Sequence, residues 1–204
     1  LIASHIDSPR IDLKQNPIFE DSNLCLFHTH YYGGIKKYQW LNIPLALHGI
    51  IVKSDLKIIE FNIGENEDDP VFVIPDLLPH LSKKVIDDKV VKEAFDADKL
   101  NLIVGSIPFS KEEKDQIKLN ILKILSETYG INEEDFISAE ITLTPAFIAK
   151  DAGFDRSLIA GYGQDDRICA YTSLKAFFDS KKTPQTQVIL MVDKEEIGSE
   201  GNTS

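Results

Sequence analysis

The sequence predicts an α/β fold that carries a mostly β insertion. Residues 188–192 form a continuous apolar run of strand length, the pattern of a parallel strand that is covered on both faces. Residues 56–63 alternate between apolar and polar side chains, which is typical of an antiparallel strand. Apolar side chains recur at helical intervals in residues 117–125 and again in residues 168–178. Strands of both kinds, with helices to cover them, are therefore expected in one chain.

A first strand is expected to end near Ser4 and to lead into His5 and Asp7. Alternate side chains of a strand point the same way, so His5 and Asp7 are predicted to lie on one side. A carboxylate in that position can hold a metal-binding imidazole in one tautomer and orient its ring. A lone histidine beside an apolar run is, however, more often a core residue. The pattern therefore depends on support from the rest of the chain.

An inserted domain is predicted over residues 43–140, because neither flank carries a complete fold alone. Residues 45–52 and 56–63 are expected to pair as a β-hairpin, and residues 71–74 to form a further strand. Four aromatic side chains just before the insertion are interpreted as core packing. They are Tyr31, Tyr32, Tyr38 and Trp40.

A helix is predicted in the second half of the insertion. Ser110 and Glu113 have the spacing of a capping box, which marks a helix start. Ile117 and Leu125 then fall on one apolar face, and Gly130 is expected to end the helix. The charged side of this helix is most simply a solvated surface.

The C-terminal part of the chain places acidic residues where predicted elements begin and end. Residues 141–144 alternate like a strand, and a helix is expected from Asp165 to Lys182. Asp165 at this helix start could be a capping residue alone. Glu195 and Glu196 follow the apolar strand, and ligands of open α/β sheets bind beyond the carboxyl ends of the strands. The expected apolar face of the helix consists of Ile168, Tyr171, Leu174 and Phe178.

Four motifs together are more specific than any acidic pair alone. They are His-Ile-Asp-Ser-Pro-Arg-Ile-Asp-Leu-Lys at residues 5–14, Tyr-Tyr-Gly-Gly at 31–34, Gly-Tyr-Gly-Gln-Asp-Asp-Arg at 161–167 and Asp-Lys-Glu-Glu-Ile-Gly-Ser-Glu at 193–200. In this order they resemble the aspartyl aminopeptidase family of dinuclear zinc exopeptidases, and the resemblance spans nearly the whole chain. It implies a zinc-exopeptidase-like mixed sheet flanked by helices, with an inserted, mostly β dimerisation domain.

The resemblance also implies roles for individual residues, with two zinc ions per active site. His5 would bind one zinc and Asp165 would bridge both. Glu196 would bind the second zinc, and Glu195 would be the general base. Asp7 would be the partner that orients His5. Histidine and carboxylate ligands without a cysteine cluster suit catalytic zinc, although other divalent metals remain open.

The domain roles follow from the same resemblance. Residues 1–42 and 141–204 would be parts of the catalytic domain, and residues 43–140 would be the assembly domain of a homo-oligomer, as in the dodecamers of the family. His80, in a Leu-Pro-His segment, would enter the active site of a neighbouring subunit, although an exposed loop histidine is nearly as good an interpretation. The remaining metal ligands would lie beyond Ser204, and both chain ends look cut from a longer protein.

The expected activity is removal of the amino-terminal residue from peptides, with no indication of which residue is preferred. A related dinuclear peptidase of other specificity and a deacylase are alternatives within enzymes. A homologue that lost catalysis and acts as an assembly scaffold is the alternative from another class.

Composition limits the partners. The chain has a formal net charge of -11, which argues against nucleic acid and anionic membranes. No apolar run reaches the roughly 20 residues of a membrane span. Two cysteines, Cys25 and Cys169, make no disulfide framework, so a reducing cytoplasm is the expected location. Cys169 is expected to be a small buried residue of its helix.

Overall fold

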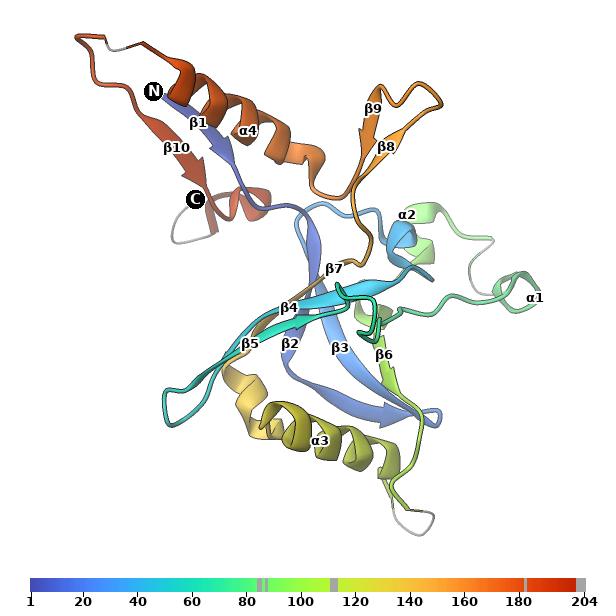
Figure 1. Ribbon diagram of the computed structural model, residues 1–204. Coiled ribbons are helices and arrows are strands. Elements are labelled where there is room, and N and C mark those ends of the chain that lie inside the picture. The colour runs from blue at the N-terminus through green and yellow to red at the C-terminus, as the bar shows by residue number, and fades with distance from the viewer. Residues whose placement is uncertain (84–85, 87, 111–113, 182, 201–204) are drawn as a thin grey trace. The chain divides into compact units, whose positions relative to one another are not determined.

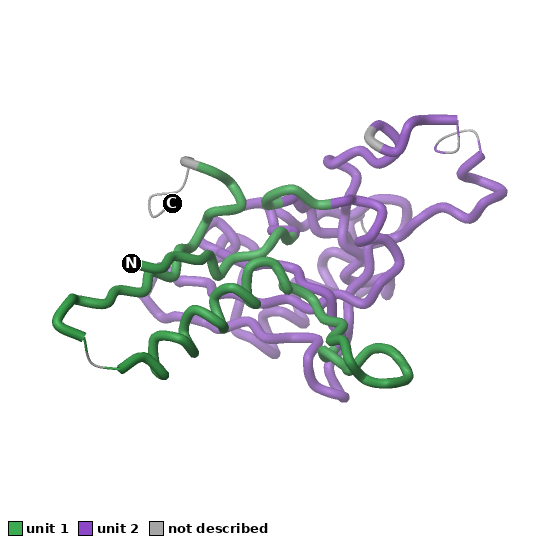
Figure 2. Tube along the Cα trace, turned by 90° about the horizontal axis from the view of Figure 1, so that it is seen from above, with its two compact units in different colours: residues 1–10, 32–35, 148–204 green, residues 11–31, 36–147 purple. Residues whose placement is uncertain are grey.

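The computed structural model describes residues 1–83, 86, 88–110, 114–181 and 183–200 (Figure 1). The chain divides into two compact units, coloured separately in Figure 2. Unit 1 comprises Leu1–Arg10, Tyr32–Ile35 and Ile148–Ser204, and unit 2 comprises Ile11–Tyr31 and Lys36–Phe147.

Unit 1 is built on two parallel strands, β1 (Ile2–His5) and β10 (Ile189–Val192). His5 is paired with Val192 at the carboxyl ends of both strands, and the Ile6 N–H donates to the Val192 carbonyl at 2.9 Å. The parallel strand predicted from the apolar run is thus confirmed. Because both strands run the same way, the residues that follow His5 and those that follow Val192 leave the sheet at one edge.

Helix α4 (Gln164–Asp179) lies along β1 and β10 (Figure 1). The helix is confirmed, but its predicted buried face is wrong. Ala170 is the buried residue of α4, whereas the stripe expected to be buried is exposed, with Tyr171 66% and Phe178 73% accessible. Small side chains let a helix backbone approach two strands closely, so the small-residue face packs and the large apolar face stays open. Leu190 of β10 is also 50% exposed, so β10 is not covered on both faces by the described residues.

Two smaller elements complete the described part of unit 1. Strands β8 (Lys150–Ala152) and β9 (Leu158–Ala160) form a hairpin that precedes α4. The 3-10 segment η4 (Glu195–Glu200) begins three residues after β10.

Unit 2 contains a six-stranded sheet in the order β5-β4-β7-β2-β3-β6, in which β2 with β7, β3 with β6, and β4 with both β5 and β7 pair in antiparallel fashion. Hairpin β4–β5 confirms the predicted pair of strands. The strands are β2 (Arg10–Asp21), β3 (Leu24–Tyr32), β4 (Leu45–Val52), β5 (Ile58–Ile63), β6 (Leu102–Gly105) and β7 (Glu140–Pro145).

Helix α3 (Gln116–Tyr129) runs along one side of this sheet (Figure 1). Ile117 and Leu125 are buried as predicted, and Gly130 ends the helix in the left-handed conformation. The carboxylate of Glu20 accepts the N–H groups of Ile117 and Lys118 at 2.8 and 2.9 Å, which supplies an acceptor for two amides of the first turn. The predicted capping box of residues 110–113 lies outside the described residues, apart from Ser110.

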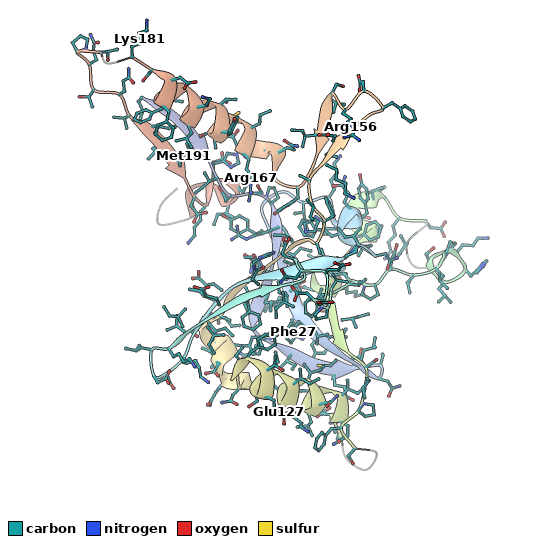
Figure 3. All side chains as sticks on the ribbon, in the orientation of Figure 1. Phe27, Glu127, Arg156, Arg167, Lys181 and Met191 are labelled. Atoms are coloured by element: carbon teal, nitrogen blue, oxygen red, sulfur yellow. The ribbon has the colours of Figure 1, made fainter. Side chains whose placement is uncertain are left out.

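The remaining elements of unit 2 are short. Phe27, labelled in Figure 3, packs edge-on against Phe136 of the 3-10 segment η3, with ring centroids 5.5 Å apart. Residues 71–74 were expected to be a strand but make isolated bridges, including Phe72 with Leu45. The short segments are η1 (Lys37–Trp40), α1 (Pro79–Ser82), α2 (Val91–Ala94), η2 (Ala97–Lys99) and η3 (Glu133–Ser138).

The unit boundaries differ from the predicted domain boundaries. Residues 11–31 and 141–145 were assigned to the catalytic domain by the sequence, yet β2, β3 and β7 share one sheet with β4 and β5. Strand β7 pairs with both β2 and β4, a long-range arrangement that local patterns do not contain. In the described part of the chain, no helix has the length and apolar character needed to span a membrane.

Candidate metal centre

Five potential ligands gather where β1 and β10 end and α4 begins. His5 forms one group with Asp165 and Asp166, and a second group with Glu195 and Glu196. Within each group, ligand atoms lie within 4.8 Å of one another. All five residues belong to unit 1. Three segments that are far apart in the sequence therefore supply one cluster of nitrogen and oxygen donors.

The carboxylates lie at different distances from the His5 imidazole, and that of Asp165 is nearest to its Nε2. Its Nε2 lies 3.3 Å from Asp165 Oδ1, 3.8 Å from Glu195 Oε2 and 4.0 Å from Asp166 Oδ2. Ligand atoms of a tetrahedral zinc ion at about 2.0–2.1 Å are roughly 3.3 Å apart. The His5–Asp165 separation fits a shared ion without rearrangement, and the donor set is one that zinc accepts.

Asp7 organises the turn that carries the two glutamates. Its side chain is 1% exposed. Oδ1 accepts the Glu195 N–H and Oδ2 accepts the Glu196 N–H, both at 3.2 Å. Oδ2 also accepts the Tyr32 hydroxyl at 2.7 Å. Burial alone would raise the pKa of Asp7, but the Tyr32 and backbone hydrogen bonds outweigh burial and lower the pKa, so the carboxylate stays charged.

Asp7 and His5 are neighbours, as the sequence predicts, but the nearest contact is with the main chain. His5 Nδ1 lies 2.9 Å from the Asp7 carbonyl oxygen and 3.4 Å from Asp7 Oδ1. An N–H at Nδ1 that donates to this carbonyl leaves Nε2 free to bind a metal. Burial lowers the pKa of His5, and the Asp7 contact and the charges of Glu195 and Asp166 together raise it above its usual value.

Asp165 and Asp166 have different surroundings. The Asp165 side chain is 86% exposed, while that of Asp166 is 16% exposed. Asp166 Oδ2 accepts the His5 backbone N–H at 3.2 Å, and the carboxylate also accepts the Cys169 thiol. The buried Ser8 hydroxyl donates to the Asp165 carbonyl at 3.1 Å. Asp166 is thus engaged in holding β1 against α4, whereas the Asp165 carboxylate remains available near His5.

Three residues of this site lie within the quoted motifs, but no role in the metal site was predicted for them. Tyr32 was interpreted as core packing and is buried, but its hydroxyl binds Asp7. The Arg10 guanidinium lies 3.7 Å from the centre of the Tyr32 ring. Gly33 has φ +72, and a Cβ there would meet Glu196 Cβ at 3.0 Å. The glycines of the motif Tyr-Tyr-Gly-Gly were the available signal, because glycine is the usual residue where the backbone takes a positive φ or another group approaches it closely.

Negative charge is in excess at this site, because one histidine is surrounded by several carboxylates. Burial raises the pKa of Glu196, and the nearby negative charges of Asp165, Asp7 and Glu195 raise it further, against the lowering effect of His5. Carboxylates packed this closely repel one another, and a divalent cation would relieve the repulsion. Electrostatics and donor chemistry therefore both fit zinc.

Two other predictions concern Cys169 in unit 1 and His80 in unit 2. Arg167 in the first half of α4 and Met191 in β10 are labelled in Figure 3. Cys169, expected to be buried, is exposed. His80 lies on α1 in unit 2, and its side chain is exposed.

Comparison with known proteins identifies the family. The sequence profile described as "Aminopeptidase I zinc metalloprotease (M18)" matches residues 1–204. A probable M18 family aminopeptidase 1 of Thermotoga neapolitana is 56% identical over 203 residues, which are 100% of this chain and 44% of that protein. The crystal structure of an M18-family aminopeptidase from Thermotoga maritima has a TM-score of 0.92 at 55% identity, and the match covers 100% of this chain and 44% of that one.

The fold is shared with a more distant structure. The S. cerevisiae mApe1 dodecamer has a TM-score of 0.65 at 18% identity, covering 100% of this chain and 45% of that chain. The mixed α/β fold, with its mostly antiparallel sheet, is that of solved M18 aminopeptidases. The chain spans 44% of the length of the Thermotoga relative. It belongs to the aminopeptidase I family of zinc metalloproteases, M18.

Proposed function

We propose that this chain supplies part of the active site of a zinc aminopeptidase that removes the amino-terminal residue of peptides. The observation that carries the proposal is the meeting of His5 with four carboxylates at the carboxyl edge of β1 and β10. Membership in a family of zinc metalloproteases gives this cluster its chemistry.

The proposed site holds two zinc ions. His5 and Asp165 bind the first ion, a role supported by the 3.3 Å between Nε2 and Oδ1. Asp165 would also hold a second ion, together with Glu196. Support for the bridging role comes from the exposure of the Asp165 carboxylate, whose neighbour Asp166 is engaged with the His5 backbone.

The proposed chemistry divides between metal and protein. Zinc, when bound, supplies Lewis acidity at the scissile carbonyl and makes water easier to deprotonate. Glu195 takes the proton from the attacking water and delivers it to the leaving amine. Asp7 fixes the Glu195 and Glu196 amides, so that their side chains start from a defined backbone.

Assembly is proposed to complete the site. Residues 43–140 are assigned to subunit contacts, and His80 to the active site of a neighbouring subunit. The exposed position of His80 on α1 is compatible with this role, and the dodecamer formed by S. cerevisiae mApe1 supports self-association.

The test uses the full-length gene product. The protein is stripped with a chelator, reloaded with zinc, and given matched peptides that begin with Asp, Leu or Lys. Zinc-restored release of the first residue is expected, and the ranking of the three peptides gives the specificity. Peptides with an acetylated amino terminus are the control and should resist. Release of the acyl group from these peptides would favour a deacylase, and no release by a zinc-loaded oligomer would favour the scaffold.

A further inference from the structure

The segment Tyr32–Ile35 is a short excursion of the chain into unit 1. Tyr32 is the last residue of β3, whose other residues belong to unit 2. Two residues of this segment lie close to the turn that carries Glu195 and Glu196. Tyr32 is linked to it through Asp7, and Gly33 lies so near that a Cβ there would meet Glu196.

The Tyr32 hydroxyl completes the set of donors around Asp7. Asp7 Oδ2 accepts both this hydroxyl, at 2.7 Å, and the Glu196 N–H, at 3.2 Å. The oxygen is therefore held from two directions, which fixes the rotation of the carboxylate. Oδ1 is then aimed at the Glu195 N–H and lies beside the His5 ring. Without the hydroxyl, one anchor of a side chain that touches three parts of the site is lost.

Arg10 holds the phenol ring in turn. Its guanidinium carbon lies 3.7 Å from the Tyr32 ring centroid, in the range of a cation–π contact. A planar guanidinium over the ring face restricts the tilt of the ring. Tyr32 is 6% exposed, so the hydroxyl has little water to replace Asp7 as its partner.

Gly33 acts on the other side of the turn. With φ +72, it adopts a conformation that residues with a Cβ rarely take. An added Cβ would meet Glu196 Cβ at 3.0 Å and Glu196 Oε2 at 3.2 Å. The absence of a side chain at Gly33 therefore defines where the Glu196 carboxylate can lie. Gly34 is different, because a Cβ there would meet nothing within 4 Å.

We propose that Tyr32 and Gly33 are positioning residues of the zinc site, which set the Asp7 carboxylate and the Glu196 side chain and so fix the ligands before metal binds. The inference rests on the proposed function, because it assigns Glu196 and His5 as zinc ligands. It adds a role for a motif that the ligand set does not use.

The test measures zinc affinity in the full-length protein by competition with a chelator, without substrate. Tyr32→Phe removes one hydroxyl and keeps the ring under Arg10, so the fold should survive. Outer partners that bond a metal ligand typically account for 10–100-fold in metal affinity, and Tyr32 acts one step further out, through Asp7, so a loss of up to about tenfold is expected. Tyr38→Phe is the matched control, since Tyr38 is 45% exposed and lies in unit 2. Its zinc affinity should equal that of the wild type.

A pair of glycine variants tests the same inference independently. Gly33→Ala is expected to lower zinc affinity and to change the visible spectrum of the cobalt-substituted protein, because Glu196 is displaced. Gly34→Ala should leave both unchanged. If Tyr32→Phe does not fold, this pair decides. Equal zinc affinity of Gly33→Ala and Gly34→Ala, together with a wild-type value for any folded Tyr32→Phe, overturns the inference.

Activity separates this inference from the proposed function. If the wild type lacks zinc-dependent peptide release, the proposed function fails, while the affinity measurements still decide the positioning roles. If the wild type is active, Tyr32→Phe should lower kcat more than it raises KM, because it disturbs the ligands and not the peptide-binding surface.

Discussion

Replacing Asp7 by Asn should lower the zinc affinity of the proposed site, although the substitution only exchanges one carboxylate oxygen of the side chain for an NH₂ group. The carboxylate accepts three donors, namely the N–H groups of Glu195 and Glu196 and the Tyr32 hydroxyl. An amide has only one oxygen. The amide would keep more hydrogen bonds with its oxygen at the position of Oδ2, where it still accepts the Tyr32 hydroxyl and the Glu196 N–H. Its NH₂ group would then face the Glu195 N–H, which loses its acceptor.

The magnitude follows from the lost contact. A hydrogen bond to a charged group contributes about 1.5–3 kcal/mol, and the Glu195 N–H would in addition face another donor. Since 1.4 kcal/mol is tenfold, a loss of about 2 kcal/mol corresponds to roughly thirty-fold in zinc affinity, provided that the loss falls on the arrangement that binds zinc. Asp7 is 6% exposed, so water offers little compensation.

The assay is chelator competition for zinc and kcat/KM for peptide release in the full-length protein. Asp179→Asn is the matched control, because Asp179 is exposed at the end of α4 and pairs with Lys175 at 2.9 Å, a surface ion pair of about 0–1 kcal/mol. The control should behave as wild type. Zinc affinity and kcat/KM of Asp7→Asn within twofold of wild type would refute the assigned role of Asp7.

Three further predictions concern the glutamates, the thiols and acid stability. Glu195→Gln should abolish turnover and retain zinc, while Glu196→Gln should lose zinc; metal analysis that shows the reverse would exchange their roles. Iodoacetamide should modify exposed Cys169 in the native protein, slowly because its hydrogen bond to Asp166 raises the pKa of that thiol, and buried Cys25 only after unfolding, because burial raises the pKa of Cys25 to about 12; peptide mapping checks this. Backbone hydrogen bonds lower the pKa of Asp69 in the folded protein below the value of about 3.9 that it has in the unfolded chain. The charged Asp69 side chain therefore stabilises the fold above the unfolded pKa, and this stabilisation is lost as pH falls through the folded pKa. The urea midpoint of wild type should therefore exceed that of Asp69→Asn at pH 6, and the two midpoints should converge toward pH 2. A difference between the midpoints that persists at pH 2 would contradict the stabilising role of the Asp69 carboxylate.

The sequence was sufficient to predict that the site lies at the edge of the sheet where β1 and β10 end. The apolar run of residues 188–192 and the residues before His5 are local signals, and parallel pairing makes their ends coincide. The acids that follow then have to lie near His5. Local patterns also predicted the β4–β5 hairpin and helix α3, since both depend on neighbours in the sequence.

The rest of the arrangement depends on long-range contacts that periodicity does not contain. Tyr32 reads as an aromatic core residue, and only its partner Asp7, 25 residues away, gives it a second role. The apolar stripe of α4 predicts a buried face, yet the strands take the face with Ala170. Strand β7 alternates as predicted, but its Thr142 bonds to His48, 94 residues away, inside the six-stranded sheet.

The pairing of β1 with β10 also determines when unit 1 can fold during translation, because β10 is synthesised long after β1. Ser4 and Met191, which touch across the two strands, are 187 residues apart. At about 5–20 residues per second, β1 waits on the order of 10–40 s on the ribosome before β10 emerges. The strands of unit 2 are complete in that interval, because they all precede residue 148. His5 is therefore translated well before the glutamates that lie beside it, and the cluster of potential metal ligands can form only after Glu196 has been translated.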